Sequence, residues 1–160
     1  MITKNKTICQ LKRLLFSLLL PAAITTAIPL QAQTCTSKLP RQLRVASYNI
    51  QHGVGMEHKL DYKRIANVLE DINPDVVAIQ EVDSMTRRTG NTYSLGEIAD
   101  HMRYYASYAP AISFNGGKYG IGILSRKRPI RTEQHALPGR EEARTLLVAE
   151  FDDYVFAATH

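Results

Sequence analysis

Residues 75–82 read Asp75-Val76-Val77-Ala78-Ile79-Gln80-Glu81-Val82, an apolar run that leads into an amide and a carboxylate. Four successive apolar residues are typical of a strand that is buried on both faces. A carboxylate at the end of such a strand is costly to bury unless a positive partner compensates its charge. Open α/β sheets bind their ligands at the carboxyl ends of their strands, so a metal ion is the partner we expect for Glu81.

A second strand is expected about 30 residues earlier, at Leu43-Arg44-Val45-Ala46-Ser47-Tyr48-Asn49-Ile50, and it also ends in a polar side chain, Asn49. Between the two strands, Asp61 can cap a helix that ends before Pro74. Apolar residues follow the cap at helical spacing: Ile65, Val68, Leu69 and Ile72. A strand, a helix and a strand in this order predict a parallel pair of strands.

The rest of the chain predicts one further helix and then a run of strands. A polar loop at 83–92 precedes the helix, whose apolar positions are Leu95, Ile98, Ala99 and Met102. Strands are expected at 104–114, 119–125 and 130–137, and the last of these could pair with the strand at 119–125. A hairpin is expected from 144–151 and 154–159 around Asp152-Asp153. This order predicts helices packed on mixed sheets.

Residues 1–32 have the pattern of a secretory signal peptide, with basic residues before an apolar stretch and a plausible cleavage site after Ala32. An uncleaved membrane anchor is disfavoured because Pro21 interrupts a short apolar run, and Ala32-Gln33-Thr34 lacks the small residue expected before a lipidated Cys35. Residues 33–42 are expected to be a flexible lead-in and residues 43–160 a single domain. We therefore expect a secreted or periplasmic protein with no membrane span after signal removal.

The net charge of the chain gives no support to nucleic-acid binding. The 160 residues contain 20 basic and 15 acidic side chains, but four of the basic ones and none of the acidic ones lie in residues 1–32. The remaining chain is nearly neutral, so its basic character comes from the targeting segment. Cys35 is the one thiol outside that segment, and no Cys/His cluster indicates a structural zinc site.

His160 is the third polar residue that closes an expected strand, after Asn49 and Glu81. A common sheet edge could bring the three together, and an amide, a carboxylate and an imidazole suit phosphoryl transfer assisted by a hard cation such as Mg²⁺. Each residue also has a simpler interpretation. Asn49 could be a strand-end hydrogen-bonding residue, Glu81 could pair with an arginine, and His160 could be a surface histidine.

Four segments in order resemble successive motifs of the endonuclease/exonuclease/phosphatase superfamily. They are Ser47-Tyr48-Asn49-Ile50, residues 75–82, Tyr119-Gly120-Ile121-Gly122-Ile123-Leu124-Ser125-Arg126 and Ala158-Thr159-His160. The resemblance implies a four-layer α/β sandwich, in which two mixed sheets are flanked by helices. It also implies Mg²⁺ or Mn²⁺ as the cofactor, with Glu81 as the metal ligand, Asn49 near the metal and its water, and His160 hydrogen-bonding the scissile phosphate.

Several basic residues are candidates for contacts with a substrate phosphate. The loop at 83–90 resembles that of the secreted bacterial branch of the superfamily, and its Arg87 or Arg88 could line the cleft, although a solvated charged loop is the simpler interpretation. Arg144 could bind a phosphate with two hydrogen bonds or pair with Glu141. Lys118, beside a Gly-Gly turn, is open in the same way.

Two later motifs of the superfamily are an Asp-x-Asn and a Ser-Asp-His; no Asp-x-Asn follows Glu81 in this sequence, and no Ser-Asp-His occurs in it. We therefore expect the chain to be the N-terminal half of the domain, with its C-terminal part missing and little hydrolase activity of its own. The full-length parent would be a monomeric metal-dependent phosphodiesterase or phosphatase acting on a nucleic acid, a phospholipid head group, or a sugar or inositol phosphate. The alternative is a catalytically dead module of the same fold that binds phosphorylated ligands at the cell envelope.

Overall fold

The computed structural model of the protein describes residues 42–139 and 142–160. The predicted signal peptide and nearly all of the predicted lead-in lie outside these residues. The described elements follow in order: β1 (Val45–Asn49), the 3₁₀ helix η1 (Gln51–Gly53), α1 (Tyr62–Ile72), β2 (Val76–Ser84), the 3₁₀ helix η2 (Arg87–Thr89), α2 (Ser94–Met102), β3 (Tyr105–Phe114), β4 (Gly117–Ser125), β5 (Arg131–Leu137), β6 (Arg144–Glu150) and β7 (Val155–Thr159). No helix in this described part has the length and apolar character needed to cross a membrane.

The expected strand–helix–strand unit is present as β1, α1 and β2. The carboxylate of Asp61 accepts a hydrogen bond from the backbone N–H of Arg64 at 2.8 Å, which satisfies a free donor of the first turn of α1. The helix stops at Asn73, whose left-handed backbone directly precedes Pro74. β1 and β2 then pair in parallel, with Asn49 opposite Gln80, which confirms the predicted pairing.

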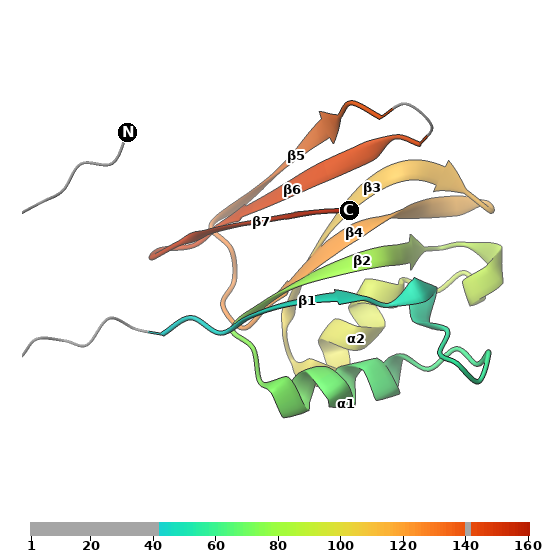
Figure 1. Cartoon of the computed structure of the whole chain (residues 1–160), viewed down its shortest axis with the longest axis horizontal. Helices are drawn as coiled ribbons and strands as arrows, with labels where there is room; N and C mark the ends of the chain where they lie inside the picture. Colours follow the sequence, from blue (N-terminus) through green and yellow to red (C-terminus); the bar gives the residue numbers. More distant parts are fainter. Residues whose placement is uncertain (1–41, 140–141) are drawn as a thin grey trace, which may run out of the picture. The chain divides into compact units, whose positions relative to one another are not determined.

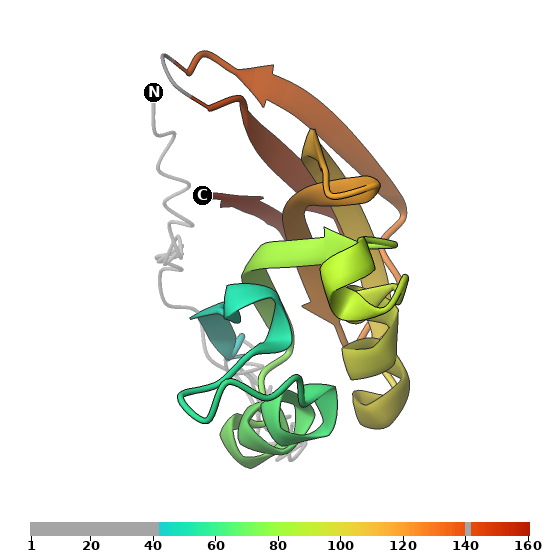
Figure 2. The ribbon, with the colours of Figure 1, turned by 90° about the vertical axis from the view of Figure 1, so that its right-hand side faces the viewer.

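The strands form two sheets, one of order β1-β2-β4-β3 and one of order β5-β6-β7. Figure 1 shows α1 and α2 on one face of the four-stranded sheet and the three-stranded sheet on its other face, and the turned view in Figure 2 shows the same layers. The described residues thus form three layers of a mixed α/β fold: helices, a mixed sheet and an antiparallel sheet. The β6–β7 hairpin around Asp152-Asp153 is confirmed.

The predicted pairing of the strand at 130–137 with that at 119–125 is wrong. β5 pairs instead with β6, antiparallel, from Arg131 opposite Glu150 to Leu137 opposite Arg144. The reason lies in β4, which is hydrogen-bonded to β2 on one side and to β3 on the other and so has no free edge. The chain must leave the first sheet after Ser125 to find a partner.

Two apolar cores hold the layers together. The first core lies between the helices and the four-stranded sheet and includes Leu69 and Leu95, which are fully buried. The second lies between the sheets and includes Ile123, Leu147 and Phe151. Each fully buried side chain of this size contributes about 1.5–3 kcal/mol of transfer free energy, so the two cores fix the spacing of the layers.

β2 continues past the residue where the sequence predicts its end. It runs to Ser84, so Glu81 lies inside the strand, and Asp83, predicted to lie in a polar loop, is fully buried in it. The pairing of β2 with β4 shifts register between Ile79 and Val82, which marks a β-bulge at residues 80 and 81. The charged residue therefore interrupts the ladder locally instead of ending the strand.

Candidate functional site

Asn49 and Glu81 are in direct contact at the carboxyl end of β1. The Asn49 side-chain N–H donates to Glu81 Oε1 at 2.7 Å, and Asn49 Oδ1 accepts a hydrogen bond from the backbone N–H of Gln51 at 3.0 Å. Gln80 turns the other way and donates to the Ser47 hydroxyl at 3.1 Å. The bulge thus separates the amide from the carboxylate and places the carboxylate against Asn49.

The bulge depends on an unusual backbone conformation at Glu81, whose φ is 59°. This is the left-handed region, which costs a residue with a side chain about 1–2 kcal/mol. A carboxylate would not be expected here on grounds of stability, since glycine is the residue that adopts this conformation freely. Strained residues of this kind cluster at functional sites, which is consistent with a role for Glu81.

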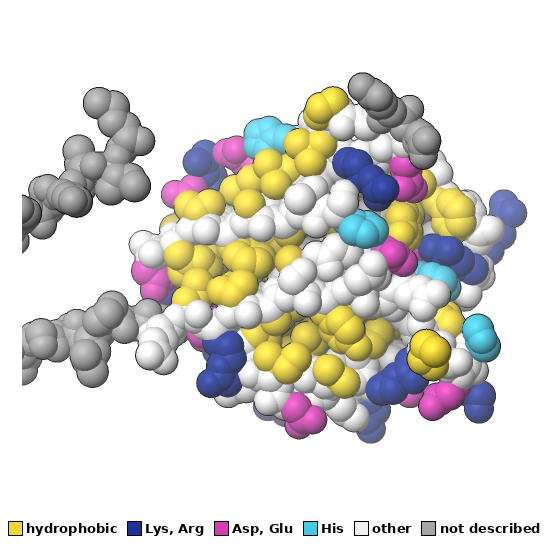
Figure 3. Space-filling model, viewed as in Figure 1, with side chains coloured by type: hydrophobic (Ala, Val, Ile, Leu, Met, Phe, Trp, Pro, Cys, Tyr) yellow, Lys and Arg dark blue, Asp and Glu magenta, His cyan; other side chains and the backbone are white. Residues whose placement is uncertain are grey.

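Glu81 opens into a pocket of about 320 Å³. Its lining combines polar and apolar side chains: Gln51, His52, Glu81, Arg88, Ile112, Phe114, Tyr119 and Glu142. Charged and histidine side chains gather at the end of the molecule where β1 and β2 end (Figure 3). The sequence indicates Arg88 as one of two alternatives for a residue lining the cleft, but it does not single out His52 or Glu142. The position of His52 just after the Asn49 strand is the one signal that could have indicated it.

The pocket sets the protonation of the groups that line it. Burial lowers the pKa of His52, and the positive charge of Arg88 lowers it further, so the imidazole is neutral at pH 7. Burial and then the charges of Glu81 and Glu142 raise the pKa of Tyr119 to about 12, which keeps its hydroxyl protonated. The pocket therefore holds a permanent cation, a neutral imidazole and a phenol beside the Glu81 carboxylate.

His160 reaches this region from the other sheet. It follows β7 and lines a narrow crevice together with Arg144, and Tyr119 and Glu142 line both this crevice and the Glu81 pocket. The expectation that a single sheet edge unites the three residues is wrong, because Asn49 and Glu81 belong to one sheet and His160 follows a strand of the other. The candidate site is instead assembled where the two sheets meet.

The remaining predicted phosphate contacts lie in different places. Arg144 forms an ion pair with Glu142 at 3.1 Å, while Glu141, its predicted alternative partner, lies outside the described residues. Arg87 is not among the residues that line the Glu81 pocket. Lys118 lines a separate pocket of about 500 Å³ and donates to the Ser113 hydroxyl at 2.8 Å. Their roles as phosphate contacts stay predictions.

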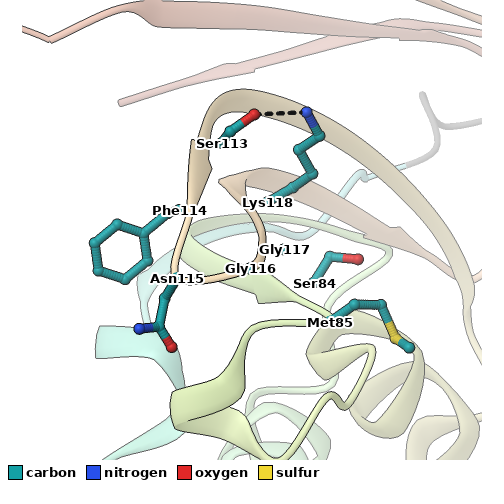
Figure 4. A pocket seen from close by; sticks show the side chains of 8 residues that line it. All are labelled: Ser84, Met85, Ser113, Phe114, Asn115, Gly116, Gly117 and Lys118. Carbon is teal, nitrogen blue, oxygen red and sulfur yellow. Dashed lines mark hydrogen bonds between the residues drawn. The ribbon is translucent and has the colours of Figure 1, made fainter.

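Figure 4 shows the pocket that Lys118 lines. Lys118 and Ser113 point together to one side of the β3–β4 hairpin, whereas the ring of Phe114 points away from Ser84 and Met85. Phe114 is the residue shared by the two pockets. The alternation of side chains along a strand explains the division, since Lys118 and Tyr119 are neighbours on β4 and face opposite ways.

The donor set at Glu81 fits Mg²⁺ or Mn²⁺ better than zinc. Within the residues that the structure describes, no group of three or more His, Cys, Asp or Glu side chains could enclose a metal. Mg²⁺ does not need such a cage, because it keeps several waters and is commonly bound through one or two carboxylates and substrate phosphates. One carboxylate held in place by an amide, open to a pocket, is compatible with that mode of binding.

The sequence matches the model of the Endonuclease/Exonuclease/phosphatase family over residues 46–157, and the chain belongs to this family. The family includes metal-dependent phosphoesterases and nucleases, and its enzymes generally use divalent metals such as Mg²⁺. A comparison with curated protein sequences gave no match.

Solved structures of the same fold include an endonuclease/exonuclease/phosphatase from Beutenbergia cavernae, with 22% identity and a TM-score of 0.61 over 74% of this chain and 38% of that one. A family protein from Leptotrichia buccalis has 12% identity and a TM-score of 0.59, over 74% of this chain and 55% of that one. TDP2 from C. elegans has 24% identity and a TM-score of 0.55, over 74% and 35%. At these identities the likeness shows the fold, and this chain spans roughly one third to one half of each.

Proposed function

We propose that the full-length protein is a divalent-metal-dependent phosphoesterase, acting on a phosphodiester or a phosphomonoester, and that this chain supplies the Asn49–Glu81 part of its site. The observation that carries the proposal is the 2.7 Å hydrogen bond that holds the carboxylate of Glu81, a residue that lines the pocket. Membership of a family whose members are typically hydrolytic enzymes supports it. Secretion or periplasmic localisation and a monomeric state are part of the same proposal.

Each residue has a role that follows from its chemistry. Glu81 would hold the metal ion, which when bound supplies a Lewis acid that polarises a phosphoryl oxygen. Asn49 holds Glu81 Oε1 and so limits the rotation of the carboxylate. The imidazole of His160, beside Tyr119, would donate a hydrogen bond to another phosphate oxygen as negative charge builds on it.

Metal binding is the first test of this proposal. Mn²⁺ binding to the 160-residue chain is measured by electron paramagnetic resonance for the wild type and for Glu81→Gln, which keeps the oxygen that accepts from Asn49 but loses the charge. Affinity should fall at least about tenfold. Glu70→Gln, an exposed carboxylate of α1, removes the same charge elsewhere and should bind Mn²⁺ as the wild type does. Equal affinity of wild type and Glu81→Gln would refute the assignment of Glu81.

Hydrolysis is the second test. Turnover of bis-p-nitrophenyl phosphate and of p-nitrophenyl phosphate with Mg²⁺ is measured for the 160-residue chain and for the chain extended by any open reading frame after codon 160. The extended protein should hydrolyse one of the two, and Glu81→Gln should lower its rate by at least about 100-fold. Phosphate binding with no turnover in either protein would instead favour the catalytically dead binding module.

A further inference from the structure

Arg88 is the best-anchored cation of the Glu81 pocket. Its Nε and Nη2 donate to the two carboxylate oxygens of Asp83, both at 2.7 Å, in a parallel two-bond pair. The side chain of Asp83 is 0% exposed, whereas that of Arg88 is 32% exposed, so the charge is fixed from inside the fold and presented at its surface. The Thr86 hydroxyl also donates to Asp83 at 2.5 Å, which leaves this buried carboxylate well satisfied.

Three further contacts limit the movement of Arg88. The guanidinium lies 4.4 Å from the ring centre of Phe114 and 5.6 Å from that of Tyr119. The backbone N–H of Arg88 donates to Asn115 Oδ1 at 2.8 Å, which ties the η2 segment to the β3–β4 hairpin. A side chain held in this way loses little conformational entropy when it binds a ligand.

The guanidinium still has donors to offer. Arginine has five N–H groups, and Asp83 uses one on Nε and one on Nη2, so both Nη1 hydrogens and one Nη2 hydrogen remain. Arg88 lines the same pocket as Glu81, and its charge acts on the neighbouring His52, whose pKa it lowers. The three remaining N–H groups of Arg88 therefore belong to a positive charge that acts on groups inside the pocket.

We propose that Arg88 is the residue that binds the substrate phosphate in the Glu81 pocket, and that Asp83 is the positioning residue that orients it. This deepens the proposed function, because the phosphate is that of its phosphoester substrate. The other candidates are less suited. Lys118 is in a different pocket, Arg87 does not line this one, and Arg144 is paired with Glu142. Arg88 has two available N–H donors on Nη1, and it lines the same pocket as Glu81.

The test uses inorganic phosphate as the probe in ¹⁵N correlation spectra of the 160-residue chain. The Arg88 Nε–Hε resonance is followed where arginine is present, and the backbone amide resonances of the pocket residues give the dissociation constant in every variant. Phosphate should shift the Arg88 Nε–Hε resonance in the wild type. Arg88→Lys keeps a positive charge for Asp83 but loses the two-donor geometry, and the dissociation constant for phosphate should rise about 10- to 100-fold. Arg128→Ala removes an exposed arginine after β4 as the control for charge, and it should bind phosphate as the wild type does.

A variant that lacks Arg88 could fail to fold, because it would leave the buried carboxylate of Asp83 without its partner. A second variant therefore controls for misfolding. Asp83→Asn with Arg88→Gln keeps a neutral hydrogen-bonding pair, and it should fold while losing phosphate binding to the same extent. Asp83→Asn alone should weaken phosphate binding and broaden the Arg88 Nε–Hε resonance, which a purely structural role of Asp83 would not predict in a folded variant. Wild-type phosphate affinity in Arg88→Lys, or no shift of the resonance in the wild type, would overturn the proposal.

The two proposals fail in different ways. Mn²⁺ binding reports on Glu81, and phosphate binding in metal-free buffer reports on Arg88. If Glu81→Gln abolishes Mn²⁺ binding while Arg88→Lys binds phosphate normally, the assignment of Arg88 is wrong and the proposed function stands. If Arg88→Lys loses phosphate binding but Glu81→Gln binds Mn²⁺ normally, the assignment of Glu81 is wrong and the assignment of Arg88 to phosphate binding stands.

Discussion

The left-handed backbone of Glu81 predicts that this residue lowers the stability of the protein, and paired substitutions can measure by how much. We compare Glu81→Gly with Glu81→Ala, both of which lose the hydrogen bond to Asn49. At a φ of 59°, alanine carries the left-handed penalty of about 1–2 kcal/mol and glycine does not. Glycine in turn loses about 0.5–1 kcal/mol more conformational entropy on folding than alanine. When the entropy cost of glycine is subtracted from the penalty of alanine, Glu81→Gly should be more stable than Glu81→Ala by up to about 1.5 kcal/mol, with a central value of about 0.75 kcal/mol.

Thr132, an exposed residue of β5 with ordinary strand geometry, provides the matched control. At position 132 glycine and alanine differ only in conformational entropy, so Thr132→Gly should be less stable than Thr132→Ala by about 0.5–1 kcal/mol. The entropy difference is common to both positions and cancels between them, which leaves about 1–2 kcal/mol for the left-handed conformation. Urea unfolding of the four variants, followed by circular dichroism, measures the difference. A glycine variant that is less stable than the alanine variant at both positions would refute strain at Glu81.

Three other substitutions test the surroundings of the site. Arg88→Met leaves the fully buried carboxylate of Asp83 without its ionic partner and should cost about 3–5 kcal/mol in urea unfolding, whereas a cost below about 1 kcal/mol would contradict the pair. Gly120→Ala would place a Cβ in steric overlap with the backbone carbonyl oxygen of Ala109, so the midpoint temperature of thermal unfolding should fall well below that of the wild type; an unchanged midpoint would contradict the close strand packing. Tyr119 has a pKa of about 12 in the fold against 10 in the unfolded chain, so the unfolded state loses its proton first and stability should fall as the pH rises from 10 to 12. Tyr119→Phe should show a shallower fall between pH 10 and 12, and identical pH profiles would contradict the raised pKa of this half-buried phenol.

The parts of the fold that the sequence predicts well are those fixed by neighbouring residues. The cap at Asp61 and the stop before Pro74 define α1 because each acts within one helical turn. The pairing of β5 was not predictable in this way, since it depends on whether β4 has a free edge, and this is settled by β2 and β3 far away in the chain. Local sequence thus predicts where helices and strands lie, whereas the pairing of the strands depends on how the sheets assemble.

The candidate site shows the same division. The sequence predicts that Asn49 and Glu81 lie together because each follows an apolar strand pattern, and the structure shows them hydrogen-bonded. The bulge at Glu81 was not foreseen, because it exists only in the register between β2 and β4. Asp83 was expected in a loop on account of its charge, but Arg88 makes its burial possible. A polar residue is therefore a poor marker of a strand end when its partner follows a few residues later.

The assembly of the site from two sheets means that its dimensions are set at a distance. Glu81 is carried by β2 and His160 follows β7, and the side chains that separate the strands of the two sheets include Ile123, Leu147 and Phe151. This core sets the distance between the two parts of the candidate site, because a change in its volume moves Glu81 relative to His160. A displacement of about 1 Å can cost a hundredfold in rate. Under the proposed function, a smaller residue at 147 would therefore change the rate of hydrolysis as well as the stability, although Leu147 does not line the Glu81 pocket.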